Sequence, residues 1–287
     1  MDTNKNIIIP NPEKLKKLQK EFCCDGVDKV HVVSDFDKTL TTAFVNGKKC
    51  PSLISILRDD DKYLSSDYAK KAHILFNKYH PIEIDPNINI QKKRNEMHKW
   101  WLEHYKLLSK SGLKKKHINE IVLSSNIKLR IKINEFFDFL YKYNIPLIII
   151  SANVLGNESI KTFLKYQKIM YNNIHIISNT LKFDKNGLFV KVIEPIIHSM
   201  NKNETIIKDL KVFKKIKNRK NVILLGDGLG DINMADGFDY SKIIKIGFLN
   251  DNVDKKIEFF KENYDIIILN DSSMEYVNIL LKRILKI

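Results

Sequence analysis

Two acidic residues near the start of the chain have the spacing of a metal-assisted nucleophilic site. In Val32-Val33-Ser34-Asp35-Phe36-Asp37-Lys38-Thr39, Asp35 and Asp37 follow a short apolar run, and a threonine comes two residues after the second acid. A carboxylate at a strand end that shares a cation can act as a nucleophile, and a second carboxyl group that keeps its proton can act as a general acid. The alternative interpretation of two acids at this spacing is an Asx turn that closes a strand.

A second pair of acids lies on a glycine-rich loop. Gly226-Asp227-Gly228-Leu229-Gly230-Asp231 follows another apolar run. Glycine lets a backbone turn tightly beside a ligand, and carboxylates are the oxygen ligands that Mg²⁺ prefers. By itself this loop resembles nucleotide-binding loops and ordinary turns.

Two further polar side chains suit a phosphate group. Ser151 ends the apolar run 147–150, where its hydroxyl group can donate to a phosphate oxygen, and Lys202 can balance phosphate charge. Each also has an ordinary structural interpretation, as a strand end and as one of many lysines.

The elements that position these residues follow from the hydrophobic pattern. Apolar runs typical of buried strands are Val30–Ser34, Ile145–Ser151, Asn221–Gly226, Ile243–Gly247 and Asp265–Asn270. Helical patterns between or after them are Arg130–Tyr143, Ser159–Lys168, Thr205–Ile216, Val253–Glu262 and Met274–Leu285. This alternation predicts an α/β, Rossmann-like parallel sheet with helices on both faces, in which ligands bind at the carboxyl ends of the strands. The alternating segment Asn173–Glu194, with a turn at 184–187, predicts a β-hairpin.

Residues 44–129 break the alternation. They contain helical patterns over Ser66–Tyr79, Ile90–Lys110 and Leu113–Ser124. Between the first two, Pro81-Ile82-Glu83-Ile84-Asp85-Pro86 is predicted to be an extended connector, because proline restricts the residue before it. We therefore expect an inserted helical cap domain, 44–129, and a core formed by 1–43 and 130–287.

Composition narrows the class of protein. The chain has 287 residues, 44% of them hydrophobic, and a net charge of +15. No apolar run reaches the roughly 18 residues of a membrane span. Three cysteines without metal or redox spacing favour a reducing compartment, and we expect a cytoplasmic monomer. The lysines are scattered, which favours a small anionic substrate over a dedicated nucleic-acid surface.

Taken together and in this order, the motifs resemble the haloacid dehalogenase superfamily. Within it, the chain resembles the pyrimidine 5′-nucleotidase family, also called cytosolic 5′-nucleotidase III, from about residue 28 to the C-terminus. The matching stretches are Asp35–Thr41, Gly47–Pro51, Ile82–Pro86, Trp100–Trp101, Ser151–Ala152, His198–Lys202, Gly226–Gly237 and Ile246–Val253.

The resemblance implies roles for the core residues. Asp35 would attack phosphorus, and Asp37 would protonate the leaving oxygen and then activate water. Mg²⁺ would lie between the Asp35 carboxylate, the Asp37 carbonyl and Asp227, supported by Asp231. The phosphate oxygens would be held by Ser151, Ala152, Lys202 and Thr39.

The resemblance also implies a base-binding pocket in the cap. Glu83 aligns with the base-recognising glutamate of the family, and Trp101 lies near its aromatic wall; an acceptor-only carboxylate and an aromatic face suit a base such as cytosine. Ser55 and His104 stand where relatives place small polar residues. Lys99 and the segment Asn153–Asn157 depart from the family pattern, so base preference follows less directly than phosphatase chemistry.

The expected activity is Mg²⁺-dependent hydrolysis of CMP and UMP through an aspartyl-phosphate, with transfer to a nucleoside hydroxyl as a side activity. One alternative is a related phosphatase for a purine or methylated nucleotide, phosphoserine or a sugar phosphate. An alternative of another class is a basic nucleic-acid-binding protein on a degenerate phosphatase fold. The intact acids, Ser151 and Lys202 argue against that class.

Overall fold

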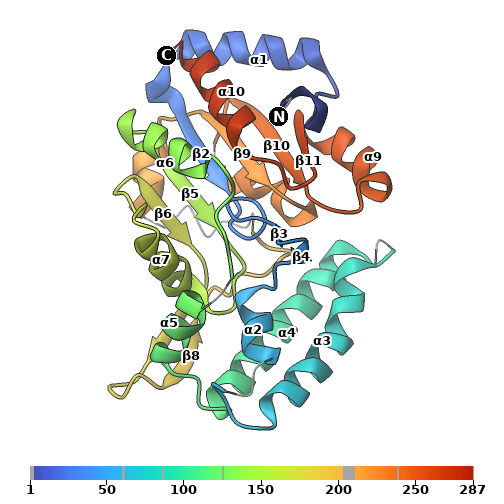
Figure 1. Cartoon of the computed structure of the whole chain (residues 1–287), viewed down its shortest axis with the longest axis vertical. Coiled ribbons are helices and arrows are strands. Elements are labelled where there is room, and N and C mark those ends of the chain that lie inside the picture. The colour runs from blue at the N-terminus through green and yellow to red at the C-terminus, as the bar shows by residue number, and fades with distance from the viewer. Residues whose placement is uncertain are drawn as a thin grey trace.

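The computed structural model of this chain describes residues 3–59, 62–85, 87–124, 126–202, 211–237 and 239–286. Its centre is a seven-stranded sheet in the order β1-β11-β10-β9-β2-β5-β6 (Figure 1). The strands are β1 (Ile7–Ile8), β2 (Val30–Ser34), β5 (Leu147–Ile150), β6 (Ile174–Ile177), β9 (Asn221–Gly226), β10 (Lys242–Leu249) and β11 (Ile266–Leu269). All neighbouring strands are parallel except β1 and β11, which confirms the predicted α/β fold.

Both faces of the sheet are covered, because the central strands are mostly apolar and buried along their whole length. Every residue of β2, β5 and β9 is buried. Successive side chains of a strand point to opposite faces. Val32 accordingly packs in the cluster that contains Phe22 and Leu280, whereas Val33 packs with Ile216 and Phe260. The helices of the core are α1 (Pro12–Asp25), α6 (Ile133–Lys142), α7 (Gly156–Tyr166), α8 (Lys211–Ile216), α9 (Val253–Asn263) and α10 (Glu275–Leu285).

Residues 44–124 form a separate group of elements. They are β3 (Phe44–Val45), β4 (Lys48–Lys49), α2 (Leu53–Asp59), α3 (Tyr68–Ile84), α4 (Ile90–Lys110) and α5 (Lys115–Ser124). In Figure 1, α2, α3 and α4 lie together, whereas α5 lies beside α7 and β8. The chain leaves and re-enters the core at one place, because Thr41 and Leu129 form an antiparallel bridge. The proposed division at residues 44 and 129 stays a prediction.

The predicted extended connector at Pro81–Pro86 is wrong. Helix α3 continues through Pro81 to Ile84, and Pro86 lies outside the described residues. A proline inside a helix costs about 3 kcal/mol. Two contacts offset that cost: the His80 ring stacks on Phe76 one turn earlier at 4.6 Å, and the Lys93 ammonium group donates to the Glu83 carbonyl at 3.0 Å.

Three other elements differ from the sequence-based expectation. The predicted hairpin at 173–194 is shorter, consisting of β7 (Thr180–Phe183) and β8 (Phe189–Ile193), because Ile174–Ile177 pairs with β5 as the edge strand β6. Helix α1 was not predicted; Asn11 caps it by accepting the Lys14 N–H at 2.9 Å. The predicted helix 205–216 is described only from residue 211 onward, as α8.

Short 3₁₀ turns complete the described chain: η1 (Thr3–Asn6), η2 (Val27–Lys29), η3 (Leu229–Asp231) and η4 (Met234–Gly237). Across the described ranges, none of the helices combines the length and apolarity that crossing a membrane requires.

Candidate active site

Three parallel strands end at one edge of the sheet beside the residues with predicted chemistry. Asp35 follows β2, Asp227 follows β9 and Ser151 follows β5. Strand β2 lies between the other two, and the Asp35 N–H donates to the Leu225 carbonyl at 3.0 Å. The sheet register therefore brings together residues that are nearly two hundred positions apart in the sequence.

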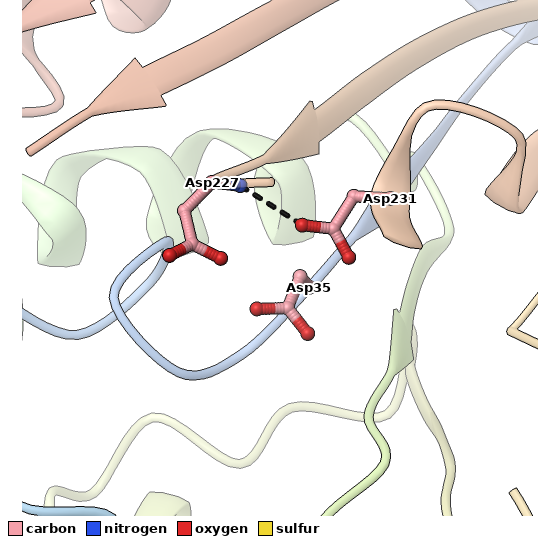
Figure 2. Close-up of side chains that lie close together, drawn as sticks. All are labelled: Asp35, Asp227 and Asp231. Carbon is pink, nitrogen blue, oxygen red and sulfur yellow. Dashed lines mark hydrogen bonds between the residues drawn. The ribbon is translucent and has the colours of Figure 1, made fainter. Parts of the chain in front are cut away.

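The acids of the two motifs form one cluster. Asp35, Asp227 and Asp231 each offer a carboxylate oxygen, and these oxygens lie within 4.8 Å of one another (Figure 2). One Asp231 oxygen accepts the N–H groups of Asp227 at 3.0 Å and Gly228 at 3.1 Å. These bonds fix Asp231 against the start of its own loop, facing Asp35.

Two glycines make this close approach possible. A Cβ atom on Gly226 would lie 2.4 Å from the Cβ atom of Asp231, and one on Gly230 would lie 2.4 Å from the Ser199 carbonyl oxygen. Neither contact is sterically tolerable, so the glycine-rich loop reflects the space that the carboxylate cluster needs.

Lys202 is the cation that the structure places in this cluster. Its ammonium group donates to Asp35 at 2.6 Å and to Asp231 at 2.8 Å. Both carboxylates are buried, and the Lys202 side chain is 10% exposed. Burial lowers the pKa of Lys202, but the Asp231 and Asp35 carboxylates outweigh it and raise that pKa. Lys202 therefore stays charged at neutral pH.

The carboxylates share more negative charge than one ammonium group balances. Burial raises the pKa of Asp35 well above its ordinary value; Lys202 opposes this, and the neighbouring carboxylates add to it. Burial and the Asp231 charge raise the pKa of Asp227 to about 7. Burial also raises the pKa of Asp37, which favours a protonated carboxyl group there.

The donor set fits a divalent cation that prefers oxygen ligands. Three carboxylates converge on one point, and a divalent ion would compensate the negative charge that Lys202 leaves unbalanced. Asp35, Asp227 and Asp231 would hold it; the predicted contribution of the Asp37 carbonyl stays a prediction.

The predicted phosphate-binding residues lie at the same edge of the sheet. The Ser151 hydroxyl oxygen accepts the Asn153 N–H at 3.2 Å, which leaves its own O–H free to donate. The buried Thr39 hydroxyl group has no hydrogen-bond partner among the described residues. The Ala152 carbonyl accepts from the Trp101 indole N–H at 3.4 Å, so Trp101 reaches from α4 to the core.

Glu83 lies at the boundary between α3 and the core. One carboxylate oxygen accepts from the Ser199 hydroxyl group at 2.5 Å, and the other lies 3.1 Å from His80 Nδ1. Ser199 precedes Lys202 by three residues in the sequence. The predicted base-binding residue is therefore close to the loop that carries the phosphate-balancing lysine.

A cavity of about 490 Å³ opens between Asp37 and the cap helices. Ser55 lines it, together with Phe76 and His80, and the Arg58 guanidinium group lies 4.6 Å from the Phe76 ring centre. Sequence analysis did not identify Phe76, His80 or Arg58; the spacing of Phe76 and His80 by four residues was the available signal. A larger cavity of about 620 Å³ contains none of the predicted residues.

Both tryptophans are buried, and they share an edge-to-face contact at 5.2 Å. Trp100 stacks on Tyr79 within the cap, whereas Trp101 lies 6.1 Å from the His198 ring at the boundary with the core. Of the pair, Trp101 contacts the core and Trp100 forms part of the cap core; the base-binding role of Trp101 stays a prediction.

His104, on α4, is buried inside the cap, and its ring nitrogen Nε2 forms a hydrogen bond with the Tyr68 hydroxyl group at 2.9 Å. The assignment of His104 to the base pocket stays a prediction. Its burial makes the stability of the protein depend on pH. Burial, with Arg58 nearby, lowers the pKa of His104 to about 4. The imidazole is thus neutral in the folded protein near pH 5, whereas it is protonated in the unfolded chain.

His104→Gln should therefore make the protein less sensitive to acid. The unfolded state binds the extra proton between pH 6.5 and 4, so wild type loses about 2 kcal/mol of stability relative to the variant from pH 7 to pH 5. Urea unfolding of both proteins at the two pH values measures this, and all other groups cancel in the comparison. An unchanged difference in unfolding free energy would show that His104 is not buried as a neutral base.

Comparison with known structures defines the class of this fold. A HAD family hydrolase from Salmonella enterica superposes with a TM-score of 0.54 over 95% of this chain and 81% of its own, at 13% identity. Cytosolic 5′-nucleotidase IIIB, in a crystal structure with cytidine bound, superposes with a TM-score of 0.88 at 29% identity. The superposition covers 98% of this chain and 94% of the nucleotidase chain. The chain therefore has the haloacid dehalogenase fold, as its motifs predicted.

Sequence comparison places the chain within that class. Residues 38–285 match the family described as pyrimidine 5′-nucleotidase (UMPH-1). A 7-methylguanosine phosphate-specific 5′-nucleotidase from Gallus gallus is 37% identical over 278 residues, which cover 96% of this chain and 95% of the relative. This chain belongs to the pyrimidine 5′-nucleotidase family and is a 5′-nucleotidase, a phosphatase of nucleotides.

Proposed function

We propose that this protein hydrolyses pyrimidine nucleoside 5′-monophosphates, CMP and UMP, with Mg²⁺ as cofactor. The observation that supports this most is the cluster of Asp35, Asp227, Asp231 and Lys202 at the strand ends, with the cap cavity opening beside Asp37. The cluster suits a phosphate and its metal, and the cavity suits a base.

Hydrolysis would proceed in two steps at phosphorus. An Asp35 oxygen forms a bond to phosphorus while the bond to the nucleoside O5′ breaks, and Asp37 gives its proton to that oxygen. Asp37 then takes a proton from water as the water oxygen bonds to phosphorus, which releases phosphate and regenerates Asp35. A nucleoside hydroxyl group that replaces water would give the phosphotransferase side activity.

Residues of the core and Mg²⁺ would together bind the phosphate group and compensate its negative charge. Lys202 and the Ser151 hydroxyl group would bind the phosphate oxygens, assisted by Thr39 and the Ala152 backbone. Mg²⁺, when bound by Asp35, Asp227 and Asp231, supplies charge neutralisation of the phosphoryl group. Fixed charges in a dry site usually contribute the largest share of such catalysis.

A second candidate substrate is 7-methylguanosine 5′-monophosphate, because the Gallus gallus relative is named as specific for it. Both candidate bases offer N–H donors to a carboxylate, and both can stack on aromatic rings. Phe76 and His80 line the cavity beside Asp37, and His80 Nδ1 lies 3.1 Å from the Glu83 carboxylate, so the pocket chemistry accommodates either base.

The test is phosphate release from CMP, UMP, 7-methylguanosine 5′-monophosphate, AMP, phosphoserine and ribose 5-phosphate in Mg²⁺. We expect kcat/KM for CMP or for the methylated nucleotide to exceed that for AMP and ribose 5-phosphate by about tenfold or more. Equal or better hydrolysis of phosphoserine or ribose 5-phosphate would contradict a nucleotide-specific site.

Glu83→Ala should weaken base discrimination and spare the chemistry. Loss of a hydrogen bond to the base costs about 1–3 kcal/mol, or roughly ten- to two-hundredfold in kcat/KM for CMP, whereas ribose 5-phosphate should change little. Ser199→Ala is the matched control, since it removes the hydroxyl partner of Glu83 and keeps the carboxylate. Equal losses on both substrates in Glu83→Ala would show that Glu83 only joins the cap to the core.

The remaining predictions from sequence are a cytoplasmic location, a monomer and no nucleic-acid partner. The three cysteines are all unpaired, as expected in a reducing compartment. A salt titration of RNA binding tests the nucleic-acid alternative, because phosphate contacts give a steep salt dependence.

A further inference from the structure

Arg130 lies where the cap segment rejoins the core, and its side chain is fully buried. Its backbone N–H donates to the Leu40 carbonyl at 3.0 Å, next to the bridge between Thr41 and Leu129. A buried guanidinium group is costly unless all its donors are paired. Its partners therefore show which parts of the protein it holds together.

On one side, Arg130 holds the turn that follows Asp37. The guanidinium group donates to the carbonyl oxygens of Lys38 at 2.5 Å, Thr39 at 2.8 Å and Thr41 at 3.3 Å. The Lys38 carbonyl also accepts from the Asn250 amide at 3.0 Å.

Lys38 has φ +60°, in the left-handed region that non-glycine residues adopt only when surrounding contacts hold them. Its N–H donates to the Thr41 hydroxyl group at 2.8 Å, so both polar groups of its backbone are fixed. The peptide plane between Asp37 and Lys38 is thereby fixed as well.

On its other side, Arg130 reaches the loop after β11 and the entrance of the cap. It donates to the Ser272 carbonyl at 2.6 Å and pairs with the Asp271 carboxylate at 3.1 Å. Asp271 in turn accepts the N–H groups of Ala43 and Phe44, each at 2.9 Å. One side chain thus connects the turn after Asp37 with the first residues of the cap segment.

Lysine cannot replace this arginine. A guanidinium group presents five donors in one plane, whereas an ammonium group is a compact charge on a flexible stem. Burial lowers the pKa of Arg130 to about 10, so the group stays charged at neutral pH. The Phe248 ring, 4.2 Å away, packs against its face.

We propose that Arg130 is a positioning residue for Asp37. It holds the turn 38–41 so that the Asp37 carboxyl group meets the leaving oxygen, and it ties that turn to the cap entrance through Asp271. This inference rests on the proposed function, in which Asp37 is the general acid; Arg130 itself touches neither substrate nor phosphate.

The dependence of the rate on the leaving group distinguishes a positioning role of Arg130 from a purely structural one. A nucleoside alkoxide needs a proton as it departs, whereas p-nitrophenolate is a stable anion that leaves without one. Hydrolysis of the aspartyl-phosphate is the same for both substrates, so the comparison is made on kcat/KM, which reports the steps up to departure of the leaving group. In those steps a misplaced Asp37 slows CMP much more than p-nitrophenyl phosphate. A smaller fraction of folded protein would slow both by the same factor.

The experiment compares kcat and KM of wild type and Arg130→Lys for CMP and p-nitrophenyl phosphate in saturating Mg²⁺. We expect kcat/KM for CMP to fall by about 10–10²-fold, part of what a general acid contributes, and kcat/KM for p-nitrophenyl phosphate to change less than about threefold. Arg219→Lys is the matched control, because Arg219 also donates to backbone carbonyls, those of Val27, Val30 and Asn144, at the opposite end of the sheet. Arg219→Lys should leave kcat/KM unchanged for both substrates.

Asn250→Ala serves as a second variant if Arg130→Lys does not fold. It removes one donor to the Lys38 carbonyl and one acceptor of the guanidinium group, at 3.1 Å, while the Asp271 carboxylate still pairs with the Arg130 charge. It should shift the ratio of the two kcat/KM values in the same direction by a smaller factor. Equal losses on both substrates, or no loss on CMP, would overturn the positioning role. Wild type that hydrolyses neither substrate would instead contradict the proposed function.

Discussion

Asp35→Asn is expected to abolish phosphate release from CMP, with a loss of at least about 10⁴-fold, because an amide is not a nucleophile and is a poor metal ligand. The fold should persist, since the substitution keeps the shape of the side chain and removes one of three crowded carboxylates. Phosphate release in Mg²⁺, with circular dichroism and thermal midpoints on the same samples, measures both outcomes.

Asp25→Asn is the matched control for this prediction. Asp25 also pairs with a lysine, Lys242, and with an amide, Asn221, but it lies at the end of α1, away from the cluster. Its substitution should leave turnover within about twofold, as expected for a change outside the site. Turnover within tenfold of wild type by Asp35→Asn would exclude Asp35 as the nucleophile.

Removal of the metal is also expected to reduce turnover strongly. Chelation by EDTA should lower kcat by about 10²-fold or more, because the phosphoryl charge loses several kcal/mol of stabilisation, and added Mg²⁺ should restore it. Ca²⁺ in excess should inhibit, since the larger ion prefers more ligands.

Asp227→Asn refines the metal prediction. It should raise the Mg²⁺ concentration at half activity, because it replaces a carboxylate ligand with an amide. Thermal midpoints with and without Mg²⁺ give a readout besides activity, since an ion that binds only the folded state stabilises it. Full activity after exhaustive chelation, or a thermal midpoint insensitive to Mg²⁺, would contradict the metal site.

The strand ends were predictable because a parallel sheet places all its carboxyl ends at one edge. Once Val30–Ser34 and Asn221–Gly226 are identified as parallel strands, Asp35 and Asp227 are expected at the same edge of the sheet, and the pairing of β2 with β9 makes them neighbours. The Asp231 carboxylate was also accessible to sequence reasoning, since the glycines around it indicate close approach. These inferences need only local pattern and topology.

The cap was less predictable because tertiary contacts decide its details. Pro81 argues for an extended segment, but the stacking of His80 on Phe76 and the bond from Lys93 keep α3 helical. The contact between Glu83 and Ser199 joins residues 116 positions apart, and the partners of Arg130 are up to 142 positions away. No periodicity in the sequence reports such contacts.

Trapping of the covalent intermediate tests the central claim most directly. Enzyme quenched during CMP turnover is treated with hydroxylamine, which converts an acyl phosphate to a hydroxamate, and the modified residue is located by peptide mass spectrometry. The account predicts a hydroxamate on Asp35 alone, dependent on CMP and Mg²⁺ and absent from Asp35→Asn. A hydroxamate on another acid, or turnover that leaves no adduct on Asp35, would contradict it.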